Sequence, residues 1–211
     1  MNDQAIIYIN FVLAAVHGRL AHADHIMHEY GDVVVRVSTL LRERHPIEDL
    51  PLYRGILLRP DYDYGVLNPF TSWSESEDVA RWFADPDGFL SRPFKQAFPD
   101  IKGRLLRTQR PPHVLFHHSW RNVFHRDGCV SLFALSSPDH GEPTRRQIAW
   151  SLDTQQEVIT TAVTDYESED CTFTPEDTAR RDELLSPPWI DRDAEEEIDM
   201  VALFIGSGGY R

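Results

Sequence analysis

The sequence predicts a single α+β domain, because helical patterns come first and short strand patterns follow without a regular βα alternation. The chain of 211 residues fits one domain, and its 41% of apolar residues is enough for a hydrophobic core. We expect a helical part over residues 1–46, a core over 52–162, an acidic insertion over 163–199 and a last strand over 200–205.

The N-terminal part is expected to contain two or three helices. A second helix covers residues 21–29, and Gly31 breaks it. Residues 33–44 form a third apolar stretch, which is either helix or strand, and His45-Pro46 stops it. The first helix is indicated by apolar residues that recur at helical spacing: Ile6, Ile9, Val12, Leu13 and Val16.

Short strands and one good helix are expected after residue 50. The helix covers residues 75–84, and its entry resembles a capping box in which Ser74 pairs with Glu77. The turn residues 85–88 end it. Besides a strand that ends near Ser74, the expected strands are residues 52–58, 114–118, 131–135, 157–163 and 200–205.

The net charge of −13 is concentrated late in the chain. Residues 163–199 contain fourteen acidic residues and three arginines, so the rest carries a net charge of −2. No basic face is visible, which disfavours nucleic acid as a scaffold partner but leaves it open as a small substrate. We interpret the acidic segment as a long insertion or flexible flap that occludes a cleft, binds a neutralising partner or merely adds solubility.

The bulk composition indicates a soluble, cytoplasmic protein that makes no use of a membrane. No run of eighteen apolar residues and no secretory signal pattern is present, although export without a signal or delivery into another cell stays open. Two cysteines, Cys129 and Cys171, form neither a disulfide framework nor a metal cluster.

Three short motifs carry residues suited to chemistry. Arg54 lies within the apolar strand 52–58, where burying an unpaired guanidinium would be costly. We therefore expect it to be paired or to face a ligand, and a guanidinium is well suited to phosphate. Ser72 precedes the capped helix without belonging to its cap. Glu157 opens an apolar strand, and Gln155 lies two residues earlier, so that an extended chain would place both on one side. Taken alone, Arg54 fits a surface arginine and Glu157 a solvated strand end. The second motif taken alone fits a capped helix with a core-facing aromatic side, although this does not account for Ser72.

Taken in order, these motifs resemble the arginine–serine–glutamate class of mono-ADP-ribosyltransferases, which contains many bacterial toxins. The resemblance runs from about residue 52 to residue 159, half of the chain. The matching elements are Tyr53-Arg54-Gly55, then Phe70-x-Ser72-x-Ser74 with the Ala80-x-x-Phe83 spacing of the next helix, and Gln155-x-Glu157-Val158-Ile159.

The resemblance implies a split antiparallel β-sandwich that grips NAD as a substrate, with the N-terminal helical region over the cleft. Arg54 would hold the NAD phosphates and ribose, and the Gly55 backbone would lie near the nicotinamide amide. Ser72 would orient Glu157, which would stabilise the positive charge that develops as the glycosidic bond opens. Further residues implied in NAD binding are Tyr53 and the stacking candidates Trp73, Phe83 and Phe89, with core packing favoured for Phe83.

Gln155 bears on the acceptor. Family members that modify arginine tend to carry glutamate there, so the resemblance disfavours arginine and leaves a protein side chain or a nucleobase as the macromolecular acceptor. A toxin or effector role is implied by the resemblance alone. Two other functions stay open: an NAD glycohydrolase that uses water at the same site, and a non-enzymatic binding protein that acts through the acidic segment.

No metal is expected. Three histidines at residues 22, 25 and 28 lack the spacing of a metal motif and fit a solvated helical face. His113, His117 and His118 surround a strand, and one of them is a conceivable general base.

Overall fold

The computed structural model describes residues 3–16, 20–48, 50–59, 70–89, 91–109, 113–122 and 150–186. The strands expected at 131–135 and 200–205 lie outside these ranges, as does the acidic segment beyond residue 186. Within them the protein has helices and one antiparallel sheet, so the α+β prediction is confirmed. None of the described helices is both long and apolar enough to cross a lipid bilayer.

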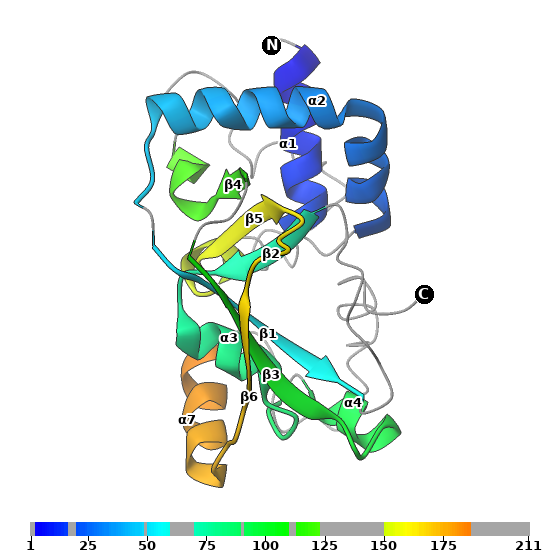
Figure 1. Ribbon diagram of the computed structural model, residues 1–211, viewed down its shortest axis with the longest axis vertical. Helices are drawn as coiled ribbons and strands as arrows, with labels where there is room; N and C mark the ends of the chain where they lie inside the picture. The colour runs from blue at the N-terminus through cyan, green and yellow to red at the C-terminus, as the bar shows by residue number, and fades with distance from the viewer. Residues whose placement is uncertain are drawn as a thin grey trace.

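Two helices form the N-terminal part, α1 (Asp3–Val16) and α2 (Leu20–Arg44). α2 is kinked at Tyr30, whose φ of −135° is not helical, one residue before the glycine expected to break it. Residues 33–44 are helix rather than strand. Both helices lie over one end of the sheet (Figure 1), where the Tyr8 hydroxyl donates to the Leu115 carbonyl at 2.7 Å.

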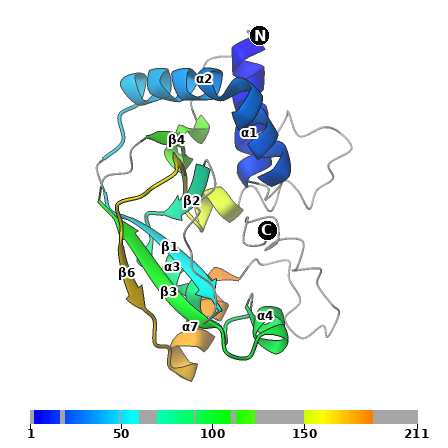
Figure 2. The same cartoon turned by 45° about the vertical axis from the view of Figure 1, so that its right-hand side comes forward.

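The sheet has six strands in the order β4-β5-β2-β1-β3-β6, and every neighbouring pair is antiparallel. Figures 1 and 2 show that the β4-β5-β2 half and the β1-β3-β6 half run in different directions. In the described part of the chain β1 and β2 share a single register pair, Tyr53 with Ser74, so the sheet splays at their junction. The strands are β1 (Leu52–Leu58), β2 (Phe70–Ser74), β3 (Lys102–Thr108), β4 (Val114–His117), β5 (Glu157–Thr161) and β6 (Glu167–Asp170).

The helix after β2 begins later than predicted. α3 covers Glu77–Ala84, and the Ser76 side chain caps it by accepting from the Val79 amide at 3.4 Å. The prediction that Ser74 is the cap is wrong, because Ser74 is still paired in β2 with Glu157. Its hydroxyl instead accepts from the Ser76 amide at 2.9 Å. Two short helical elements were not predicted, α4 (Arg92–Ala97) and the 3-10 helix η1 (His118–Asn122).

The first half of the acidic segment is built into the fold, which corrects its interpretation as a flexible flap. Residues of β6 pair with β3 at the edge of the sheet. The helix α7 (Pro175–Leu185) then packs beside α3 (Figure 1). Asp182 of α7 is buried and accepts from the Trp82 indole at 2.8 Å and from the Phe89 amide at 3.0 Å. Acidic side chains therefore serve here as an edge strand and as internal hydrogen-bond acceptors.

Candidate functional site

Arg54 lies on the face of β1 that also carries buried leucine and isoleucine side chains. Leu52 and Ile56, two positions away on each side, belong to the hydrophobic core. The guanidinium is half-buried and its NH1 donates to the Ser72 carbonyl on β2 at 2.7 Å. Its Nε is buried and has no hydrogen-bond partner in the described part of the chain. The strand thus holds a cation at the splayed junction of β1 and β2, with one donor unsatisfied.

Ser72 and Glu157 meet across β2 and β5. In the antiparallel register Ser74 lies opposite Glu157 and Ser72 lies opposite Ile159. Ser72 and Glu157 are therefore diagonal neighbours on one face, within reach of each other's side chains. The Ser72 hydroxyl donates to Glu157 Oε1 at 2.5 Å. The prediction that a hydroxyl on this strand contacts the glutamate agrees with this geometry.

Glu157 is a buried carboxyl group with an incomplete set of partners. It is 6% exposed, and its Oε2 is buried with no hydrogen-bond partner among the described residues. Burial raises the pKa of Glu157 to about 7, against the lowering influence of the Ser72 hydroxyl and the Arg54 charge. A carboxyl group of this kind exchanges its proton near neutral pH and has an oxygen free to accept a hydrogen bond.

Gln155 lies in a turn, and the expectation of an extended chain from Gln155 to Glu157 is wrong. Residues 150–153 are helical, and Gln156 has a φ of 49°, so β5 begins only at Glu157. Strand alternation therefore does not place the Gln155 side chain beside that of Glu157. The Gln155 carbonyl accepts from the Ser74 hydroxyl at 2.6 Å. Two serines of β2 thus hold the carboxyl group and the turn that presents it.

Gly55 faces helix α3, which revises its expected role. A Cβ atom at this position would lie 1.7 Å from the Ala80 carbonyl oxygen, so α3 packs directly on the glycine. The space that a side chain would occupy is filled by the protein's own backbone rather than left for a ligand. Tyr53 lies on the same face, with the Arg107 guanidinium 5.9 Å from its ring centroid.

The aromatic stacking candidates divide between two hydrophobic clusters. Trp73 is 3% exposed within the main core, and its indole donates to the Thr71 hydroxyl at 2.7 Å. The prediction that Trp73 stacks on a ligand is wrong for this reason. Phe83 and Phe89 are partly buried and pack against Trp82 between α3 and α7. Core packing, the role favoured for Phe83, is confirmed.

A second cluster of titratable groups lies where β2 and β4 end. Glu75 Oε1 is 3.0 Å from His117 Nε2, and Glu75 Oε2 is 2.8 Å from His118 Nε2. Burial tends to raise the pKa of Glu75, but the two imidazoles outweigh it and the pKa is lowered. Burial lowers the pKa of His117. The sequence pattern singled out the histidines but not Glu75. The available signal for Glu75 was its position between the end of β2 and the start of α3.

The other histidines singled out above lie apart from this cluster. His113 Nε2 lies 3.0 Å from the Ser38 hydroxyl of α2. His22, His25 and His28 are exposed on α2, as expected for a solvated helical face. No group of metal-ligating side chains involves them in the described residues.

Comparison with protein-family models, with curated proteins and with solved structures gave no match to this chain. The site is therefore interpreted from its own geometry and chemistry. That geometry brings a guanidinium, a hydroxyl and a buried carboxyl group together from β1, β2 and β5.

Proposed function

We propose that the chain is an NAD-dependent mono-ADP-ribosyltransferase with Arg54, Ser72 and Glu157 at its active centre. The observation that carries the proposal is their contact: Arg54 donates to the Ser72 backbone, and Ser72 donates to Glu157. Ser72 and Glu157 are 85 positions apart in the sequence, so folding rather than local sequence assembles the site. The splayed junction of β1 and β2 agrees with the split sandwich that the resemblance implies.

The unsatisfied atoms suit a polar ligand that offers both an acceptor and a donor. Arg54 Nε is a buried donor and Glu157 Oε2 a buried acceptor, and neither has a partner among the residues that the structure describes. Leaving such groups unpaired costs about 1–3 kcal/mol each, and natural proteins retain them mainly where a ligand or function uses them. A guanidinium suits the diphosphate, and a carboxylate suits the ribose hydroxyl of the nicotinamide half.

Cleavage of the glycosidic bond of NAD requires a carboxylate at the position of Glu157. When the bond from ribose C1′ to the nicotinamide nitrogen breaks, nicotinamide leaves with the bonding electron pair and positive charge develops on the ribose. Ionised Glu157 stabilises that charge, and Ser72 holds the carboxylate in place. The acceptor nucleophile then attacks C1′ and loses its proton. A carboxylate whose pKa is near 7 is suited to take that proton at neutral pH.

NAD labelled in its ADP-ribose part tests the proposal when it is incubated with the protein and with fractionated cell protein and RNA. Transfer predicts label on a macromolecule, whereas free ADP-ribose alone would indicate an NAD glycohydrolase. A failure of millimolar NAD to raise the melting temperature would favour a non-enzymatic protein, because a ligand that binds the folded state stabilises it.

Arg54→Ala is expected to weaken the NAD-induced rise in melting temperature. Arg107→Ala is the matched control, because Arg107 lies on the neighbouring strand but shares the opposite face with Tyr53. Equal loss of the NAD response in both variants would remove Arg54 from the proposed site.

A further inference from the structure

The turn of the chain after β4 brings two adjacent histidines to one side. Neighbouring residues in a continuous strand face opposite ways, but β4 ends at His117 and η1 begins at His118. The two rings stack with their centroids 4.5 Å apart. Each presents its Nε2 to a different oxygen of Glu75, which is 42 positions earlier than His117 in the chain. The side chains therefore converge from two separate elements.

The three ligand-type atoms are close enough to share one ion. They all lie within 4.8 Å of one another. Around a tetrahedral zinc ion, ligand atoms at about 2.0–2.1 Å from the metal are roughly 3.4 Å from each other. Closing the cluster on an ion requires the two rings to turn out of their stacked arrangement so that both lone pairs point at one position. His118 has the freedom for this, because its side chain is 22% exposed.

We propose that Glu75, His117 and His118 form a binding site for a zinc ion. Two imidazoles and one carboxylate are ligands that zinc takes, and three protein ligands leave the fourth position to water. The expectation of no metal came from sequence spacing alone, which does not reveal that Glu75 meets the histidines.

A neighbouring hydroxyl group already serves as an outer partner for His117. His117 Nδ1 lies 2.7 Å from the Ser119 hydroxyl and 3.2 Å from the Ser119 amide nitrogen. The amide donates to Nδ1 when Nε2 carries the proton and faces Glu75. With zinc on Nε2 the proton resides on Nδ1, and the Ser119 hydroxyl accepts it. Such outer hydrogen bonds fix the orientation and tautomer of metal-binding histidines.

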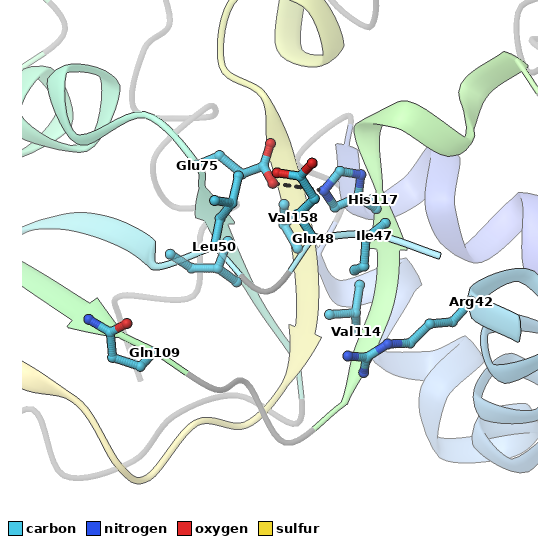
Figure 3. A pocket seen from close by; sticks show the side chains of 10 residues that line it. Arg42, Ile47, Glu48, Leu50, Glu75, Gln109, Val114, His117 and Val158 are labelled. Carbon is cyan, nitrogen blue, oxygen red and sulfur yellow. Dashed lines mark hydrogen bonds and ion pairs between the residues drawn. The ribbon is translucent and has the colours of Figure 1, made fainter. Parts of the chain in front are cut away.

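A small pocket gives the site access to solvent. Glu75 and His117 lie in its wall, and Figure 3 shows the two side chains turned toward each other with Glu48 nearby, whereas Arg42 and Gln109 line more distant parts of the pocket. Glu48 adds an exposed second carboxylate to the pocket. The pocket thus supplies an entry path for the ion and room for a water molecule on it.

The zinc site is separate from the proposed NAD site. His117 pairs with Val158, whose side chain lies on the opposite face of β5 from that of Glu157. A bound ion would link the turn between β2 and α3 to the end of β4. It would therefore stabilise the folded chain whether or not the chain acts on NAD.

Titration of the chelator-treated full chain with Zn²⁺ in a calorimeter tests this inference, with Co²⁺ absorbance as a second readout. We expect one ion per chain and a higher melting temperature with zinc. Glu75→Gln and His118→Gln should each weaken zinc binding at least about tenfold. His118→Gln guards against a loss of binding that is caused by misfolding, because the side chain of His118 is the more exposed of the two imidazoles.

His25→Gln is the matched control, because His25 is an exposed histidine of α2 and lies outside the cluster. It should leave zinc affinity and stoichiometry unchanged. The inference is overturned if the chain takes up no zinc at millimolar concentration. It is also overturned if folded His118→Gln binds zinc as the unmodified chain does, or if His25→Gln alone abolishes binding.

Discussion

Glu157 is held in an environment that opposes its charge. It is buried next to apolar residues of β5, and its partners are one hydroxyl and the charge of Arg54. Full satisfaction of a buried carboxylate takes several hydrogen bonds, and Oε2 has none from the residues described in the structure. The ionised form that the proposed reaction needs is thus destabilised in the ligand-free protein, which is a common compromise at active sites.

Glu157→Gln is therefore expected to stabilise the fold increasingly as pH rises. The folded-state pKa is raised from 4.5 to about 7, so the wild-type protein loses about 3 kcal/mol of stability between these pH values relative to the variant. Below pH 4.5 the carboxyl is neutral in both states and the advantage disappears. Urea denaturation at several pH values measures it. An equal stability difference at pH 4 and at pH 8 would contradict the account.

Ser72→Ala is expected to move the pH dependence of activity. The acid limb of kcat/KM for the wild-type enzyme should have an apparent pKa of about 7, with activity lost below it as Glu157 takes up its proton. The Ser72 hydroxyl lowers that pKa, so its loss should shift the limb to higher pH. Because the Ser72 hydroxyl is the partner of the buried Glu157 carboxyl group, its loss should also cost about 1–3 kcal/mol of stability where Glu157 is ionised. An unshifted limb would show that the hydroxyl does not tune Glu157.

The packing of α3 on the sheet depends on two glycines. A Cβ at Gly55 would lie 1.7 Å from the Ala80 carbonyl oxygen, and one at Gly103 would lie 1.9 Å from that of Ala84. These contacts bring α3 onto β1 and β3 and so fix the strand that carries Arg54.

Gly55→Ala or Gly103→Ala should consequently destabilise the protein by about 3 kcal/mol or more, because a backbone oxygen cannot move aside without displacing the helix. Gly31→Ala is the control: its Cβ would meet only the end of Met27 at 3.8 Å, and alanine favours helix. Denaturant midpoints measure all three. Similar midpoints for Gly55→Ala and Gly31→Ala would refute the close packing.

The part of the acidic segment that forms α7 holds α3 and the turn after it in place through hydrogen bonds. Asp182 accepts from the Trp82 indole and from the Phe89 amide, and Thr178 donates to buried Asp85 at 2.6 Å. Asp182→Ala should cost about 2–3 kcal/mol, because it leaves the buried Trp82 indole and the partly buried Phe89 amide unpaired. Glu176→Ala, at an exposed position of the same helix, is the control and should have a much smaller effect on the thermal unfolding measured for both. Equal effects would mean that the hydrogen bonds accepted by Asp182 contribute nothing to the stability of the fold.

At the scale of the whole molecule, different helices pack on the two halves of the sheet. α1 and α2 cover the β4-β5-β2 half, whereas α3 and α7 lie with β1 and β3 (Figures 1 and 2). Arg54 comes from one half, and Ser72 and Glu157 come from the other. The candidate active centre thus lies where the halves meet, and its geometry depends on both layers.

The sequence predicted this architecture where hydrophobic periodicity was strong. The helices of the N-terminal part and strands β1, β4 and β5 follow clear apolar patterns. β3 was missed because charged residues interrupt its apolar pair Leu105 and Leu106. β6 was missed because all its residues are exposed and its pairing with β3 leaves no hydrophobic trace. The contact of Ser72 with Glu157 was anticipated by motif order, whereas the meeting of Glu75 with two histidines depends on tertiary structure.

Nicotinamide release from NAD by wild-type protein and by Glu157→Gln tests the central claim most directly. The account predicts release by the wild type and a rate lower by about 100-fold or more in the variant, with the NAD-induced rise in melting temperature retained. Release at the wild-type rate by Glu157→Gln would contradict it. So would a wild-type protein that neither releases nicotinamide nor gains stability from NAD.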